Sequence, residues 1–259
     1  TSQTKVPLSV DIEHLKKPVF IDCIGIATSA KDALTVPIYT RNGQSYWSRQ
    51  QEEDLYFALK YVLEHKNAAI IGQNFNYDSF WFRENLCLNV VCTYDTMTLH
   101  HSMFPALEKN LGYLSSMYCE HHLYWKNEID ETRYSSPAER WAYNCKDTTR
   151  TFEIYQNLLA RIEEFRGRND KLLSAIQFQM KELHPTVRLV GNRGFDVDTS
   201  LRGEIHQQLY EAIGKLESQW KVIADAEISS SSPLQLAHFL YKDLGLEVPK
   251  VTKASANGL

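Results

Sequence analysis

The chain has 259 residues, of which 43% are hydrophobic, and it carries a formal net charge of −4. This length suits one large folded domain or two modest ones, and the hydrophobic content excludes wholesale disorder. The slightly acidic balance gives no support to a basic surface that wraps duplex nucleic acid. Cations held between carboxylates could still bring positive charge to a phosphodiester locally.

The five cysteines are odd in number, scattered along the chain, and never arranged as Cys-x-x-Cys. This pattern predicts free thiols and a reducing, intracellular location, such as a bacterial or viral-host cytoplasm or an organelle. No apolar run approaches the length of a membrane span, so we expect no membrane partner. The N-terminus has neither a signal-peptide pattern nor a starting methionine, which suggests a processed or excised piece.

The first 165 residues alternate short apolar runs with helical periodicity, in an order typical of an α/β domain. Three strands joined by short connections predict an antiparallel meander, over residues 6–12, 19–29 and 34–40. The elements that follow alternate between helix and strand, with helices at 52–65, 77–87 and 137–165 and strands at 68–72 and 90–96. We therefore predict a mixed central sheet covered by helices.

After residue 166 the strand signal fades and long helical patterns take over. Helices are expected at 170–190 and 200–225. A third is expected at 233–245, where a preceding serine can cap its start and Gly245 is suited to end it. The sequence thus predicts an α-helical region behind the α/β domain.

Asp11 and Glu13 lie two residues apart on the first predicted strand. Side chains at i and i+2 of a strand point to the same face, so both carboxylates converge while Ile12 enters the core. They stand near the C-terminal end of the strand, where α/β sheets often carry their sites. By itself a D-x-E pair is common and also fits a solvated strand end.

Further acidic residues follow on two predicted helices. Asp78 lies in the first turn after strand 68–72, where a carboxylate suits the helix dipole and could simply cap the helix. Tyr143 and Asp147 are spaced i and i+4 on helix 137–165, which places a phenol and a carboxylate on one face. That face must dock beside the strand-borne pair if the acids are to form one site.

Taken in order, the motifs D-x-E at 11–13, G-Q-N-x-x-Y-D at 72–78 and Y-x-x-x-D at 143–147 resemble the proofreading exonuclease of family A, DNA polymerase I-like enzymes. That exonuclease is of the DEDD type with a tyrosine, and the resemblance implies its RNase H-like fold. The segment Y-D-T-M at 94–97 resembles the stretch that follows the second motif, and the resemblance spans residues 6–165.

The resemblance implies a metal-dependent 3′-5′ DNA exonuclease that releases nucleoside 5′-monophosphates. It makes Asp11, Glu13, Asp78 and Asp147 ligands of two divalent metal ions, Mg²⁺ or Mn²⁺, which prefer oxygen donors. Asp11 would bridge both ions, Glu13 and Asp147 would complete one site, and Asp78 would serve the other partly through water. Tyr143 would orient the attacking water, since a phenol with a pKa of about 10 is a better positioner than a base.

Contacts to the substrate, a single-stranded or frayed DNA 3′ end, are harder to predict. Asn74 and Phe75 in the second motif are expected to touch the terminal nucleotide, although Asn74 also suits a turn and Phe75 a core position. Other aromatic residues, such as Phe80 and Trp81, could stack on bases or fill the core.

The segments G-F-D-V-D at 194–198, S-P-L-Q-L at 232–236 and L-G-L at 244–246 resemble the beginning of the polymerase region and its thumb. We therefore expect an exonuclease domain at 1–165, a connecting helix at 166–190 and a partial thumb at 191–259. Palm and fingers are missing, so the chain is not expected to polymerise DNA by itself. The remainder of the polymerase would be its partner in cis, if the chain is a fragment, or in trans, if the gene is split.

Two rival functions fit part of this pattern. Ribonuclease D-type exoribonucleases share the four acids and the tyrosine, but a compact helical RNA-binding domain would be expected to follow them. Some polymerase-associated exonuclease folds are non-catalytic scaffolds that have lost their carboxylates, whereas all of them are present here. A DNA exonuclease therefore remains the favoured function.

Overall fold

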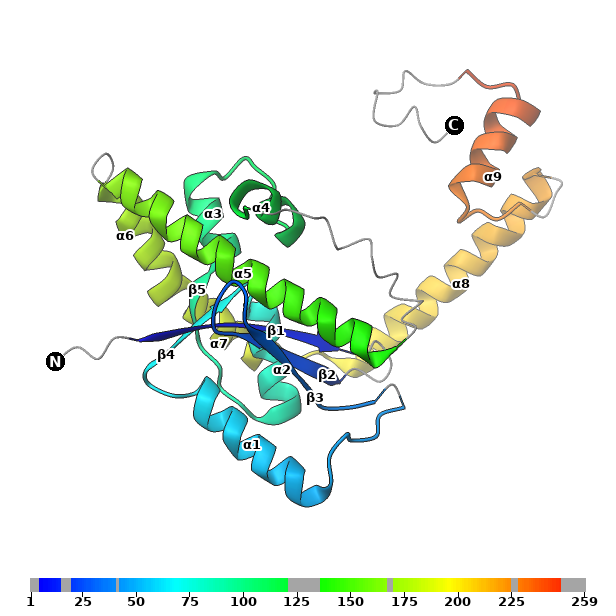
Figure 1. The fold of residues 1–259 in the computed structure, drawn as a ribbon. Helices are drawn as coiled ribbons and strands as arrows, with labels where there is room; N and C mark the ends of the chain where they lie inside the picture. Colours follow the sequence, from blue (N-terminus) through cyan, green and yellow to red (C-terminus); the bar gives the residue numbers. More distant parts are fainter. Residues whose placement is uncertain are drawn as a thin grey trace. The chain divides into compact units, whose positions relative to one another are not determined.

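The computed structural model describes residues 5–14, 20–40, 42–120, 136–166, 170–224 and 228–247. The chain divides into two compact units, at 1–194 and 195–259. The first unit combines a sheet with helices, and the second is helical over its described residues (Figure 1). The predicted order, an α/β domain followed by a helical region, is confirmed.

A five-stranded mixed sheet forms the centre of the first unit, in the order β3-β2-β1-β4-β5. Its strands are β1 (Val6–His14), β2 (Ile21–Ala27), β3 (Ala33–Pro37), β4 (Ala68–Gly72) and β5 (Cys92–Asp95). The first three form the predicted antiparallel meander. β4 and β5 join in parallel because helical crossovers precede each of them.

Helices cover both faces of this sheet. They are α1 (Arg49–Leu63), α2 (Asn76–Leu86), α3 (Thr96–Met103), α4 (Leu111–Tyr118), α5 (Pro137–Arg166), α6 (Asp170–Phe178), a π-helical turn η1 (Gln179–Leu183) and α7 (His184–Arg193). The long α5 packs across one face, against β1, β2 and β3, while α1 lies against the other face (Figure 1).

The single helix expected over 170–190 is interrupted by η1. Pro185 follows this turn and has no N–H to donate to Lys181, so the regular hydrogen-bond ladder cannot continue through it. The segment is also packed against the helices of the α/β domain and is not a free connector. α6 contacts α3 and α5, whereas α7 contacts α2. The first compact unit therefore extends to Gly194, beyond the boundary expected at 165.

The second unit contains α8 (Thr199–Ala224), α9 (Pro233–His238) and a π-helical turn η2 (Phe239–Asp243). Trp220 joins them, since its ring lies 5.5 Å from that of Phe239 and its Nε1–H donates to the Ile228 carbonyl at 2.9 Å. Ser232 caps α9 and Gly245 has a φ of +66°, as the sequence predicts. The expected region beyond 247 lies outside the described residues.

Across the described helices, none is long and apolar enough to cross a bilayer.

The two faces of β1 differ in chemistry. Leu8, Val10 and Ile12 are buried in a core shared with α1 and α2. The alternate residues, beneath α5, are small or polar, and they continue on β2 with Cys23, Gly25 and Ala27. Small side chains let a helix come close to the strands, so this face can bring α5 near the Asp11 side of the sheet.

Gly25 allows α5 to approach the sheet closely. It lies opposite Asp11 in the antiparallel register. A methyl group on Gly25 would lie 2.4 Å from Asn144 Oδ1 and 2.8 Å from Thr148 Cγ2, both on α5. Because the interior is close-packed, α5 would have to move away from β2 to accept it.

Gly25→Ala is therefore expected to lower the free energy of unfolding of the first unit by about 1–3 kcal/mol, the usual effect of overpacking. Thermal unfolding followed by circular dichroism measures it as a lower Tm. Gly203→Ala on α8 is the matched control, because no atom lies within 4 Å of a methyl group there and alanine favours a helix. An unchanged Tm for Gly25→Ala would contradict the tight contact.

Candidate active site

Three carboxylates meet where α5 crosses β1. One oxygen each of Asp11, Glu13 and Asp147 lies within 4.8 Å of the others. Asp11 and Glu13 share one face of β1 and are half-buried, and Asp147 on α5 is only 4% exposed. The strand period and the docked face of α5 thus combine as the sequence requires for a single site.

Asp78 lies beside these three carboxylates and is hydrogen bonded to the unpaired edge of β1. The pairing of β1 with β4 ends at Ser9 and Ile71, so the strand continues without a neighbour on that side. Val6 N–H donates toward this side, and by alternation Ile12 N–H points the same way. Asp78 Oδ1 accepts that N–H at 3.1 Å, which anchors the buried carboxylate between Asp11 and Glu13 along the strand.

Burial raises the pKa of the Asp78 carboxyl well above its ordinary value. The hydrogen bond from Ile12 N–H lowers the pKa in part, whereas the nearby charges of Asp95 and Glu13 raise it further. A carboxylate in low dielectric beside other negative charges is stabilised by a proton or by a cation. The site is thus built to attract positive charge.

Asn144 connects Asp11 to α5. The residue is fully buried, and its Nδ2 donates to Asp11 Oδ2 at 2.8 Å. Its Oδ1 in turn accepts the Thr35 hydroxyl of β3 at 3.1 Å, which fixes the orientation of the amide. Because Gly25 has no side chain, this amide can lie directly against β2 and reach the carboxylate.

Arg140 connects Glu13 to α5, as Asn144 connects Asp11. Its guanidinium lies 3.5 Å from Glu13 Oε2, pairs with Asp22 Oδ2 at 2.5 Å, and donates to the His14 carbonyl at 2.9 Å. Burial raises the pKa of Asp22, and the adjacent Arg140 offsets this only in part. Arg140 therefore holds the end of β1 at a defined distance from α5.

The turn before α2 is held in place by Asp95, the last residue of β5. Asp95 is fully buried, and its carboxylate accepts the Phe75 N–H at 2.8 Å and the Thr98 N–H at 3.1 Å. It thus caps α3 and fixes the chain just before Asp78. Asn74 forms the turn itself, with a φ of +55°, and its side chain is exposed.

Phe75 does not occupy the position expected of a substrate contact. Its ring is 1% exposed and packs 6.2 Å from that of Phe82 in the core. Gly72 leaves room for it, since a methyl group there would overlap the Phe75 ring. The expected base contact is therefore corrected: this side chain supports the turn from below, and a buried ring presents no face to a base.

Tyr143 lies one helical turn before Asp147, half-buried against the core beneath α5. Its expected role toward water remains a prediction. Sequence reasoning missed Arg140, Asn144 and Asp95. The first two could have been found from their spacing, because residues 140, 143, 144 and 147 form one polar stripe on an amphipathic helix. Asp95 has the pattern of a cap, an aspartate between a strand and a helix.

The donor set fits a hard divalent cation. The three clustered ligand atoms are all carboxylate oxygens, which Mg²⁺ and Mn²⁺ prefer. Among the described residues, this cluster contains neither the imidazole nor the thiolate donors typical of structural zinc sites. Asp78 offers another carboxylate beside the group.

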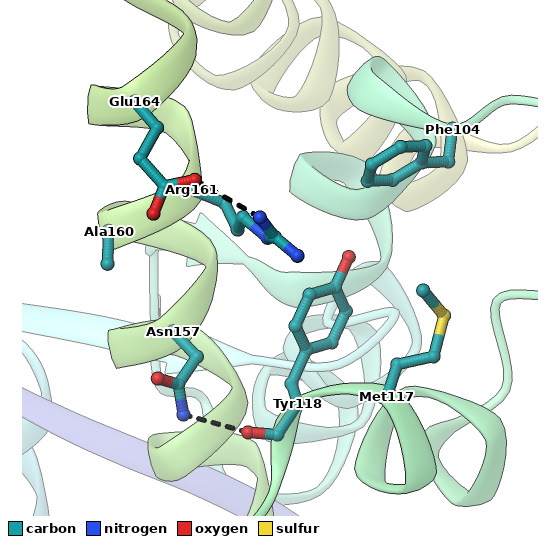
Figure 2. A pocket seen from close by; sticks show the side chains of 7 residues that line it. All are labelled: Phe104, Met117, Tyr118, Asn157, Ala160, Arg161 and Glu164. Carbon is teal, nitrogen blue, oxygen red and sulfur yellow. Dashed lines mark hydrogen bonds and ion pairs between the residues drawn. The ribbon is translucent and has the colours of Figure 1, made fainter.

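A separate pocket between α4 and α5 lies elsewhere on the first unit. Figure 2 shows Arg161, paired with Glu164, extending beside the ring of Tyr118. Asn157 Nδ2 donates to the Tyr118 carbonyl at 2.8 Å. Arg161 is fourteen residues beyond Asp147, about 21 Å along α5, so this pocket does not belong to the carboxylate site.

The raised pKa of Asp78 predicts a specific effect on stability. Because the folded-state pKa lies above the unfolded-state value of about 3.9, the charged carboxyl lowers the free energy of unfolding at neutral pH. Asp78→Asn should therefore raise the Tm at pH 7 in EDTA, and this gain should shrink as the pH falls toward about 4.

Asp54→Asn, on the exposed side of α1, is the matched control and should leave the Tm unchanged. Differential scanning calorimetry in EDTA measures both variants. A lower Tm for Asp78→Asn at pH 7 would show that the Ile12 hydrogen bond outweighs the buried charge.

Known proteins resemble both the sequence and the fold. A family model described as a 3′-5′ exonuclease (DNA_pol_A_exo1) matches residues 3–163. DNA polymerase I of Borreliella burgdorferi is 21% identical over 99% of this chain, which covers 29% of that relative. The chain thus spans less than a third of the curated relative that it matches.

Solved structures share the fold at low identity. The POL domain of Pol1 from M. smegmatis, in complex with a DNA primer-template and dNTP, has a TM-score of 0.56 and 14% identity, covering 96% of this chain and 39% of that one. Brucella melitensis NrnC with bound Mg²⁺ has a TM-score of 0.51 and 13% identity, covering 75% and 90%. The predicted RNase H-like exonuclease fold is confirmed, and the chain belongs to the 3′-5′ exonuclease family of DNA polymerase I-like proteins.

Proposed function

We propose that the chain removes nucleotides from the 3′ end of DNA as the proofreading exonuclease of a family A polymerase. The observation that carries the proposal is the meeting of Asp11, Glu13 and Asp147 within 4.8 Å. Three carboxylates so close together repel one another unless cations join them. All three residues lie within the segment 3–163 that matches a 3′-5′ exonuclease family, which supports hydrolysis as the purpose of the cluster.

The residues that would hold divalent cations are Asp11, Glu13 and Asp147, with Asp78 beside them. Bound cations supply positive charge to the phosphate and make a hydroxide available from water at neutral pH. The protein would contribute fixed geometry. Asn144 holds one oxygen of Asp11 and Arg140 stands beside Glu13, so these carboxylates keep their orientation between turnovers.

Tyr143 would position the attacking water. It lies i−4 from Asp147, on the side of α5 that meets the carboxylates. A hydroxyl at this place can accept or donate a hydrogen bond without changing charge, which suits orientation of a water rather than its deprotonation. The exposed Asn74 side chain, in the turn before Asp78, is proposed to contact the terminal nucleotide.

The polymerase context rests on the matched relatives and on the second unit. The long helix α8 and the capped helix α9 follow the exonuclease in the chain. We assign this region to part of a polymerase thumb and expect palm and fingers to act with it, in cis or in trans. The proposed substrate is then a DNA 3′ end that has frayed from its template.

Asp147→Ala should reduce metal-dependent trimming to less than about a thousandth of the wild-type rate, a loss of about 4 kcal/mol in transition-state stabilisation. The assay follows 5′-labelled primers, matched or mismatched at the 3′ end, with Mg²⁺, Mn²⁺ or EDTA. The wild type should shorten the primer from its 3′ end, faster at a mismatch, and only with metal. Circular dichroism checks that the variant is folded.

Matched RNA ends complete this experiment. Faster trimming of RNA than of DNA would overturn the DNA assignment in favour of an exoribonuclease. A folded wild-type protein that cleaves neither substrate with either metal would contradict catalysis by this chain and favour a scaffold. Undiminished activity of Asp147→Ala would remove the carboxylate cluster from the mechanism.

Asn144→Ala should raise the Mg²⁺ concentration needed for half-maximal activity by about 10–100-fold, as loss of a group that orients a metal ligand typically does. Manganese binding followed by calorimetry gives the same comparison without turnover. Thr149→Ala is the matched control on α5, because among the described residues its hydroxyl bonds only the Cys145 and Lys146 carbonyls of the same helix. An unchanged metal dependence for Asn144→Ala would contradict the positioning role.

A further inference from the structure

A groove runs between α2 and α7, which pack against each other within the first unit. It consists of two adjoining hollows of about 410 and 670 Å³. Arg188 and Asn192 of α7 line both hollows, so the two adjoin each other along α7. The sequence names Phe80 and Trp81 as possible base contacts, but it does not predict the groove that they line.

The groove begins beside the carboxylate site. Tyr77 and Trp81 line its first hollow and Glu84 its second, at positions i, i+4 and i+7 of α2. These residues occupy one face of the helix, so the groove follows α2 along its axis. Asp78 is the neighbour of Tyr77 in the chain, and the part of α2 that follows it, up to Leu86, extends about 12 Å away from it.

The end near Asp78 is aromatic. Tyr77 is 45% exposed, and its ring lies 6.2 Å from that of Trp81, which in turn lies 5.1 Å from that of Phe80. His14, the last residue of β1, packs 5.9 Å from Trp81 and hydrogen bonds the Tyr77 hydroxyl. The exposed ring of Tyr77 can stack on an unpaired base of any sequence, and the half-buried rings of Phe80 and Trp81 adjoin it.

The far end is basic. Arg83 and Arg188 line the second hollow, together with the carboxylate of Glu84. Arg188 Nη1 donates to Asn89 Oδ1 at 2.6 Å, and across the described residues neither guanidinium forms an ion pair with a carboxylate. Burial lowers the pKa of Arg188, and the like charge of Arg83 lowers it further. An anion between the two arginines would relieve this repulsion.

We propose that the α2–α7 groove holds the DNA single strand whose 3′ end enters the carboxylate site. Bases stack on Tyr77, Phe80 and Trp81, and phosphates farther from the 3′ end pair with Arg83 and Arg188. The inference rests on the proposed exonuclease function and specifies how its substrate binds. At about 3.4 Å per stacked nucleotide, the part of α2 beyond Asp78 accommodates about three to four nucleotides.

The first test removes the two charges with Arg83→Gln/Arg188→Gln. The KM for a single-stranded 12-mer should rise about tenfold, whereas cleavage of a dinucleotide, too short to reach the arginines, should change less than about twofold. The salt dependence of 12-mer binding should become shallower by about 1.4 in log–log slope, about 0.7 for each phosphate contact. Lys60→Gln/Arg161→Gln is the control, because it removes the same charge elsewhere.

The second test closes the groove without removing a contact. Gly191 lines the first hollow and has no atom within 4 Å of an added methyl group, so Gly191→Glu fits the helix and places a carboxylate in the path. It should weaken 12-mer binding as strongly as the double variant. Gly214→Glu on α8, with equally open space, is the matched control and should bind as the wild type does.

Binding of the fluorescent 12-mer is measured by anisotropy in Ca²⁺, so it is independent of cleavage. If the wild type, the arginine double variant and Gly191→Glu bind the 12-mer with equal affinity, the groove does not hold the strand. This conclusion holds even if the enzyme remains active. Weakened binding in both variants of a protein that cleaves nothing would support the groove and contradict the proposed function instead. If the arginine double variant cleaves the dinucleotide as poorly as the 12-mer, the arginines act at the cleavage site. That result would contradict the proposed path of the strand along the groove.

Discussion

Repulsion among carboxylates is the constraint on which this structure depends. Asp11, Glu13 and Asp147 bring their oxygens within 4.8 Å, and without compensation they would separate. Hydrogen-bond donors offset the repulsion from the protein side. The Asn144 amide reaches Asp11, the Arg140 guanidinium lies beside Glu13, and the Ile12 N–H binds the neighbouring Asp78. The remaining negative charge is the physical basis for the proposed binding of divalent cations.

The fold serves this arrangement through two close contacts. α5 can lie over β1 and β2 because the strand residues beneath it are small, with Gly25 directly under Asn144. On the other side of the site, Asp95 holds the turn that leads into α2. The carboxylates thus come from elements that are locked to the sheet independently. Such rigidity suits chemistry that requires a fixed geometry at one phosphodiester.

A 3′-5′ exonuclease must both cleave the end of a strand and hold the strand in place. The proposed role of the carboxylates accounts for cleavage at the end of a strand, and the proposed groove accounts for how the strand is held. An acidic chain also lacks a broad electrostatic attraction for DNA. In the proposed groove, aromatic rings near the site and two arginines beyond it would give a single strand a local attraction that the chain as a whole lacks.

The sequence by itself determined the α/β class, the meander, the helical second region and the positions of the acidic motifs. Strand and helix periods are local, so they already place Asp11 with Glu13 and Tyr143 with Asp147 on common faces. Only the tertiary structure decided what stands opposite each face. Asn144 and Arg140 look like ordinary polar helix residues until α5 docks, Phe75 looks accessible until the sheet covers it, and the first unit extends to Gly194 because α6 and α7 pack on it. Periodicity gives the direction of a side chain about its own axis, whereas partners distant in sequence are set by packing alone.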